Sequence, residues 1–221
     1  MKWIGAAAIA CCGLLVTVPA AAQSQPRVTI GGGIEWMGSS GLGSAPAAEG
    51  TGSGGTLPLF TTASDLGASA GPMVKIGVRV TRRIEVEGSG SYLRPAIETR
   101  ISGDTEGGPP VTATDRLRQF TVEGNVLYAP PRWRVHGAGI FLEGGAGYLR
   151  QLHEGDTLAA SGRLFAGGAG VRLPLVTHSR GRLRVFGLRG DARAVVRQKA
   201  AALDGGTHLA PSLAISVFAT F

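Results

Sequence analysis

The chain has 221 residues and a formal net charge of +7, which raises nucleic acid as a partner, but it carries no zinc-finger, helix-turn-helix or RNA-binding signature, so we expect none. Outside the N-terminal segment no run of about eighteen apolar residues occurs, which excludes a membrane-spanning helix there. The 36 glycines disfavour a helical protein, because glycine weakens helix interiors.

The N-terminal segment has the features of a secretory signal peptide. One lysine precedes an apolar stretch over 3–18, and small residues at 20–22 form a cleavage site. We therefore predict that residues 1–22 are removed. A lipoprotein signal with Cys11 or Cys12 as the lipidated residue is the alternative, although the residues before Cys11 match a lipobox poorly. Both cysteines would leave with the signal, so the mature chain would contain no disulfide.

From Arg27 onward, apolar residues recur at every second position, which predicts β-strands with one apolar face. The segments that show this period are 27–38, 73–80, 84–92, 118–128, 140–148, 163–175, 186–196 and 213–221. They run roughly nine to eleven residues, the length of a tilted strand that crosses a bilayer.

The connections between these segments alternate in length. Those over 81–83, 129–137 and 174–182 are short, whereas the others are longer or more flexible. The largest, 38–71, is rich in Gly, Ser and Ala, and the next, 96–115, is polar with two prolines. Both are expected as loops. Short turns at one end and longer loops at the other are typical of a bacterial outer-membrane barrel.

The sequence thus predicts a single domain over 23–221. Its expected fold is all-β: an eight-stranded antiparallel, up-and-down transmembrane β-barrel with both termini on the periplasmic side. A soluble β-sandwich or periplasmic binding module also alternates in polarity and remains open, because alternation alone does not say which face is inside. The Gly and Ser on the polar face favour a barrel with a narrow lumen.

The last strand carries a further signal. Its alternating apolar residues end on an aromatic side chain and are Leu213, Ile215, Val217, Ala219 and Phe221. Together with the eight segments and the signal peptide, this strand resembles those of the small bacterial outer-membrane β-barrel family, of the OmpA-like or OmpX-like kind. The resemblance covers the mature chain and implies the Gram-negative outer membrane as the location. It also implies that the barrel-assembly machinery reads this strand as its assembly signal.

Aromatic and arginine side chains mark the expected membrane interfaces. The outer girdle would consist of Trp36, Tyr92 and Tyr148, and the periplasmic girdle of Tyr128, Trp133, Phe186 and Phe221. A rim of outward-facing arginines beyond the outer girdle comprises Arg94, Arg116, Arg118, Arg150 and Arg163. Arginine binds phosphate bidentately, so the rim would clamp lipopolysaccharide phosphates, or it is a set of solvated charges. Arginines in the periplasmic turns would meet phospholipid headgroups.

The polar face carries charges of both signs. The expected lumen network comprises Glu35, Lys75, Arg79, Glu85, Glu87, Glu123, Glu143, Arg172, Arg189, Asp191 and Arg193. An eight-stranded barrel is just wide enough for side chains to fill, so these charges should pair. Arg79 and Glu85 flank the 81–83 turn and should face each other. The pairs form either an electrostatic plug or a gate for small ions.

The expected role is therefore structural or surface-interacting, with minor passive conductance at most and a surface ligand that the sequence does not specify. A lipid A-modifying enzyme is the alternative. Of the four histidines, His153 lies near Glu154 and Asp156, and His208 near Asp204 and Ser212. A histidine near an acid is a weak catalytic signal. No pair has the HExxH spacing of a metal site, so we name no catalytic residue, metal or cofactor.

Overall fold

The computed structural model describes residues 27–50, 56–103, 108–153, 158–178, 181–198 and 206–221. They form one 12-stranded antiparallel sheet. Among these residues no helix is long and apolar enough to cross a membrane. The expected signal segment, with both cysteines, lies outside the described residues.

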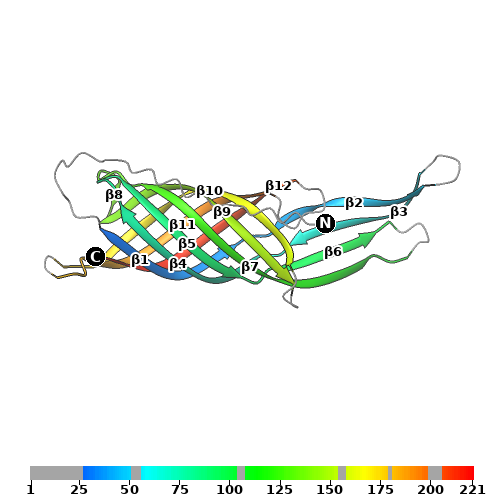
Figure 1. Cartoon of the computed structure of the whole chain (residues 1–221), viewed down its shortest axis with the longest axis horizontal. Helices are drawn as coiled ribbons and strands as arrows, with labels where there is room; N and C mark the ends of the chain where they lie inside the picture. Colours follow the sequence, from blue (N-terminus) through cyan, green and yellow to red (C-terminus); the bar gives the residue numbers. More distant parts are fainter. Residues whose placement is uncertain (1–26, 51–55, 104–107, 154–157, 179–180, 199–205) are drawn as a thin grey trace, which may run out of the picture.

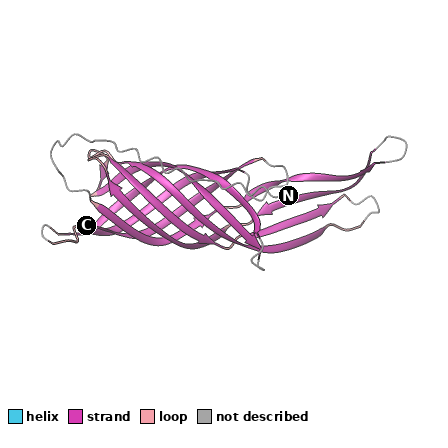
Figure 2. Cartoon of the chain, in the orientation of Figure 1, coloured by secondary structure: helices cyan, strands magenta, loops and turns pink. Residues whose placement is uncertain are grey.

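Eight of the strands close into a barrel (Figure 1, Figure 2). They are β1 (Val28–Met37), β4 (Ser69–Arg79), β5 (Ile84–Leu93), β7 (Val111–Tyr128), β9 (Ala138–His153), β10 (Leu158–Thr177), β11 (Val185–Gln198) and β12 (Thr207–Thr220). Each pairs antiparallel with the next, and β12 pairs with β1 from Thr220 to Ser212, which closes the sheet. The predicted eight-stranded antiparallel barrel is confirmed, and a β-sandwich is excluded.

A second group of strands projects from one end of the barrel (Figure 2). It comprises β2 (Ser40–Gly50), β3 (Thr56–Leu66), β6 (Ala96–Ser102) and the first residues of β7, in the order β2-β3-β6-β7. We call this group the projecting sheet. The expectation that 38–71 and 96–115 are loops was wrong for most of their described residues, because 40–50, 56–66, 96–102 and 111–115 are paired strands beyond the end of the barrel.

The other end of the barrel, which we call the turn end, has only short connections between the described strands. The short strand β8 (Arg134–Val135) pairs there with the start of β9. The C-terminus also lies at this end (Figure 1), and the backbone N–H of Phe221 donates to the Val28 carbonyl at 2.8 Å. The barrel therefore begins and ends on the same side.

The two faces of the barrel wall have opposite polarity. Val74, Val122 and Ile215 point outward and are exposed, whereas Glu35 and Glu87 point inward and are buried. This distribution reverses that of a soluble protein, in which charged residues are almost never fully buried unless they are paired. The outer face of the wall is therefore suited to an apolar solvent.

The polarity inverts near the projecting sheet. Along β7 the outward side chains change from Val122 and Phe120 to Arg118 and Arg116, while the inward side chains change from Glu123 to Leu117. The same change occurs on the inward face of the neighbouring strands, where a buried apolar cluster comprises Met37, Leu93, Leu149, Leu164, Ala166, Val195 and Ala210. Beyond this level the buried inward side chains are mainly apolar and the outward ones include arginines, as expected for a surface that meets water.

Candidate functional site

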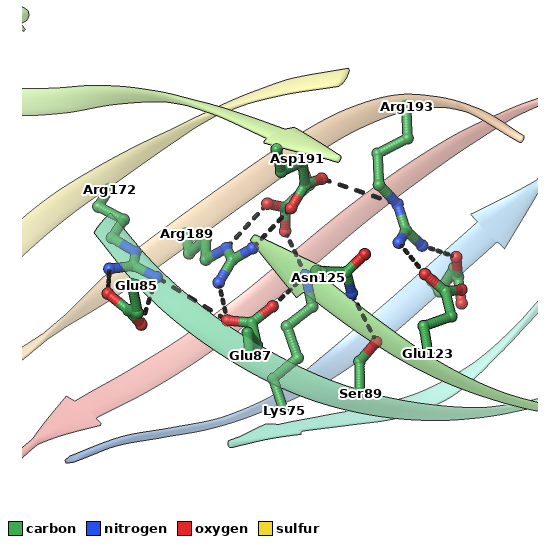
Figure 3. Close-up of polar contacts among 12 residues, drawn as sticks. Lys75, Glu85, Glu87, Ser89, Glu123, Asn125, Arg172, Arg189, Asp191 and Arg193 are labelled. Atoms are coloured by element: carbon green, nitrogen blue, oxygen red, sulfur yellow. Dashed lines mark hydrogen bonds and ion pairs between the residues drawn. The ribbon is translucent and has the colours of Figure 1, made fainter. Parts of the chain in front are cut away.

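The barrel interior brings together charged side chains from seven of the barrel strands. Because a strand points every second residue to the same side, β11 directs Arg189, Asp191 and Arg193 inward in sequence. β5 likewise directs Glu85 and Glu87 inward. The strand period alone thus places these charges inside, and barrel closure makes them meet (Figure 3).

At the turn end, Arg172 of β10 reaches across the interior to β5. Its two terminal nitrogens donate to the Glu85 carboxylate at 2.6 and 3.0 Å, which is the bidentate geometry of a strong charge-assisted pair. Arg79 is in register with Glu85, as expected from the intervening turn, and lies 4.0 Å from it. The cross-barrel contact to Arg172 is therefore the shorter of the two.

Arg189 occupies the middle of the interior. Its guanidinium donates to Asp191 at 2.8 Å, to Glu143 at 3.0 Å and also to Glu87. The Lys75 ammonium donates to Asp191 at 2.9 Å and lies 3.8 Å from Glu87. Each cation in this layer thus contacts at least two carboxylates, so no charge depends on a single partner.

Arg193 forms the next layer toward the projecting sheet. It donates to Glu123 at 2.7 Å and to Glu35, and its Nε lies 3.8 Å from Glu143. The hydroxyl of Ser212 also donates to Glu35 at 2.8 Å. The eleven charged residues predicted for the lumen therefore lie in one continuous network of ion pairs.

Arg197 is a buried cation that the sequence analysis missed. It is only 3% exposed, and no acidic side chain among the described residues lies within ion-pair distance of it. Its guanidinium instead contacts the Met37 sulfur. The signal was present in the sequence, since Arg197 continues the inward positions of Arg189 and Arg193, but the expected strand ended at Val196.

The apolar cluster around Met37 lies beside Arg197, on the projecting-sheet side of the network. Two glutamines accompany it: Gln151 donates to Gln119 at 3.0 Å, and Gln119 points to the Met37 sulfur at 3.9 Å. All of these side chains are buried. The interior therefore contains two successive packed zones, one charged and one mainly apolar.

Of the five arginines expected to form the outer rim, four lie on strands and Arg94 directly follows β5; all are exposed except Arg118, which is half-buried. Arg94 donates to the Tyr92 hydroxyl at 2.8 Å, and its guanidinium lies 5.4 Å from the ring centroid. Tyr92 in turn packs on Phe120, with centroids 4.9 Å apart. Arginine and aromatic side chains thus meet at the level where the wall changes polarity.

The expected girdle residues all lie on the outer surface. Trp36, Tyr148, Tyr128, Trp133, Phe186 and Phe221 are exposed, and Tyr92 is half-buried. At the turn end Tyr128 and Trp133 form an edge-to-face pair with centroids 5.9 Å apart. Such rings suit an interface because one end of the side chain is apolar and the other is polar.

The histidines do not assemble a catalytic group among the described residues. His153 Nδ1 lies 2.5 Å from the Asp115 carboxylate on the neighbouring strand, and both side chains are exposed to solvent. The acids expected near His153 and His208 lie outside the described residues, and the Ser212 hydroxyl is bonded within the lumen network. Within the same residues no group of three potential ligands could hold a metal ion.

Comparison with known proteins adds evidence on the fold. The chain matches no protein-family model and no curated protein sequence. It resembles the crystal structure of the outer membrane protein OprG from Pseudomonas aeruginosa, with a TM-score of 0.52 and 11% identity over 89% of this chain and 96% of that one. Ail, the attachment invasion locus protein of Yersinia pestis, matches with a TM-score of 0.39 and 12% identity over 89% and 99%. The likeness to OprG shows that the fold is that of an outer-membrane β-barrel.

Proposed function

We propose that the chain is a protein of the bacterial outer membrane with a structural or surface-interaction role, a lumen plugged by paired charges, and no enzymatic activity. The observation that carries this proposal is the packed interior. Lys75, Arg189 and Arg193 each contact two or more carboxylates, and the apolar cluster around Met37 follows them along the barrel. Ions would have to cross both zones to pass.

The energetics of the ion pairs favour a plug over a gate. Removing one partner from a buried pair costs about 3–5 kcal/mol, because the remaining charge is left in a medium of low dielectric constant. Opening a path through this barrel would displace several such contacts at once, and the apolar cluster offers displaced charges no new partners. We therefore propose minor passive conductance at most.

The surface of the barrel supports an orientation with the turn end in the periplasm and the projecting sheet outside. In outer-membrane barrels the periplasmic turns are short and the extracellular segments are longer. The rim arginines would then lie at the outer leaflet, where their planar guanidinium groups could bind lipopolysaccharide phosphates. Phospholipid would surround the turn end, and the barrel-assembly machinery would read the final strand, including Phe221.

The projecting sheet is the proposed interaction element. Its outward face carries Asp65, Glu98, Arg100 and Arg116, all exposed. The sheet is held to the barrel by the buried contacts of Leu42, Leu66 and Leu117. A charged surface that projects beyond the membrane suits contact with other molecules at the cell surface.

Cysteine labelling of whole cells tests the location and orientation. The cysteines of the chain fall in the segment expected to be cleaved, so the mature protein would carry only an introduced thiol. A membrane-impermeant maleimide should label Thr112→Cys, on the projecting sheet, in intact cells. It should label Arg132→Cys, at the turn end, only after the outer membrane is permeabilised. The reverse pattern would contradict the orientation, and equal labelling of both thiols in intact cells would contradict the placement in the outer membrane.

A further inference from the structure

The turn end of the barrel contains a cavity of about 420 Å³. It is lined by residues of the turns and by the adjoining strand ends, so it forms the mouth of the barrel at this end. Its basic residues are Arg27, Arg79, Arg82, Arg83, Arg134 and Arg172. We propose that this mouth is a binding site for a small multivalent oxyanion, such as a phosphate or pyrophosphate group.

The residues that line the cavity carry an excess of positive charge. Among its lining residues Glu85 is the single acid, and its carboxylate is already held by Arg172 at 2.6 and 3.0 Å. Arg82, Arg83 and Arg134 form no ion pair with any described acidic side chain. The situation is the opposite of the lumen network, where every predicted cation is paired with carboxylates.

The inner end of the cavity is closed. The guanidinium of Arg172 lies 5.2 Å from the Phe141 ring centroid and 5.8 Å from that of Phe218, and both rings also line the cavity. Beyond Arg172, toward the middle of the barrel, the ion pairs of Glu87 and Arg189 continue the network. The mouth is therefore a cavity closed at its inner end, which can hold a ligand without passing it through the barrel.

Like charges gathered in a concave site repel one another, and an anion relieves that repulsion. A cleft lined by one sign of charge focuses the electric field and raises the local concentration of counter-ions. Arginine adds geometry to charge, because its fork of N–H donors matches two oxygens of one phosphate. The apolar walls from Pro130, Trp133 and Phe218 lower the local dielectric constant and strengthen each contact.

The volume of the mouth favours a small ligand. Small-molecule sites occupy roughly 300–1,000 Å³. A phosphate group could come from a free periplasmic solute or from the headgroup of an anionic phospholipid beside the turn end. Only the compartment of the ligand depends on the orientation proposed above. Binding to the purified protein does not depend on it, so the two proposals can fail separately.

Calorimetric titration of the folded, detergent-solubilised protein with inorganic pyrophosphate tests the site. We expect one saturable site per chain. Arg82→Gln combined with Arg83→Gln should weaken binding roughly tenfold or more, since a hydrogen bond to a charged group is worth that factor. Both residues are exposed in a turn, so the barrel should still fold, which its heat-dependent gel migration would report. Arg134→Gln alone provides a second variant on another segment of the mouth.

The matched control removes two positive charges from exposed positions on the projecting sheet, at the opposite end of the barrel from the mouth, Arg100→Gln with Arg116→Gln. It should leave the affinity within about twofold, because charge at distant exposed sites is screened by salt. The absence of saturable binding, or equal weakening in the control, would overturn the proposal. Repeating the titration in nanodiscs with and without phosphatidylglycerol identifies the source of the phosphate. A headgroup site loses its pyrophosphate affinity when the anionic lipid is present, whereas a solute site keeps it.

Discussion

Gly168 and Gly167 are neighbours on β10 in opposite environments. Gly168 faces the lumen directly opposite Arg193 of β11. A Cβ atom placed on it would overlap the Ala192 carbonyl oxygen and lie 2.8 Å from the Arg193 Cα. A Cβ on Gly167 would meet no atom within 4 Å. The backbones of β10 and β11 therefore lie so close on the lumen side at Gly168 that no side chain fits there.

Substituting each glycine with alanine tests this packing. Gly168→Ala should destabilise the barrel by about 1–3 kcal/mol, the usual cost of forcing extra volume into a packed interior. Gly167→Ala should be neutral or stabilising by about 0.4–1 kcal/mol, because alanine restricts the unfolded chain. Urea unfolding in lipid vesicles measures both free energies. Equal effects at the two positions would show that the lumen wall is not close-packed.

Val122 and Val111 lie on the same strand on opposite sides of the level where the wall changes polarity. Val122 is 67% exposed on the outer face of the barrel, and Val111 is 59% exposed on the projecting sheet. Val122→Arg should cost about 2–4 kcal/mol, since an arginine near the bilayer midplane loses its hydration. Val111→Arg should change stability by less than about 0.5 kcal/mol, as expected at a water-exposed site. Similar costs for both variants, measured by unfolding in vesicles, would contradict a membrane boundary at Arg116 and Arg118.

Glu123 and Glu143 hold the cations of the lumen network from two strands. Glu123→Gln with Glu143→Gln would remove the contact of Arg189 with Glu143 at 3.0 Å and the contacts of Arg193 with Glu123 at 2.7 Å and with Glu143 at 3.8 Å. The expected loss of stability is about 3–5 kcal/mol, seen as a lower unfolding temperature. The control Asp65→Asn with Glu98→Gln neutralises two exposed acids of the projecting sheet and should change stability little. An unchanged unfolding temperature in the lumen variant would mean that water, and not the ion pairs, fills the interior.

Among the elements, the projecting sheet is an addition to a barrel that is already complete. None of β2, β3 and β6 takes part in the pairings that close the barrel, and β1 pairs directly with β4 from Met37↔Ser69 onward. The sheet contributes one buried cluster, in which Leu117 of β7 packs against Leu42 and Leu66. The barrel should therefore fold without the β2–β3 hairpin.

Replacing residues 38–68 with a short Gly-containing turn tests that independence. The shortened chain should still form a heat-modifiable barrel in detergent. It should lose about 1.5–3 kcal/mol of stability, because Leu117 becomes exposed. Failure to form any barrel, while the full chain refolds under the same conditions, would show that the projecting sheet is part of the folding core.

The strands of the barrel could be predicted from the sequence because lipid and lumen impose opposite polarities on alternate residues. The apolar Val122 next to the charged Glu123 shows this alternation, which can be detected without knowing the neighbouring strand. The hairpin β2–β3 does not carry it, since Ala, Gly and Ser along β2 suit either face. Its strands depend on pairing with neighbours distant in sequence, which local periodicity does not reveal.

Along its long axis, the whole molecule consists of four successive layers. A basic mouth at the turn end is followed by the charge network, then by the apolar cluster, and finally by the projecting sheet. The sequence predicted which charges face inward, with the exception of Arg197, but not that Arg172 pairs with Glu85 across the barrel. Such pairs join strands that are far apart in the chain, and only the register of the closed barrel determines which side chains meet.

Single-channel recording in planar lipid bilayers tests the central claim, that the interior is closed, most directly. Folded protein, verified by its heat-dependent gel migration, would be inserted in bilayers at high salt and held at voltages of both signs. If the ion pairs and the apolar cluster both block the lumen, as we propose, no current steps should rise above the bare-membrane baseline. Stable, ohmic steps that scale with salt concentration in the unmodified protein would contradict the account, since they require a continuous water-filled path through the barrel.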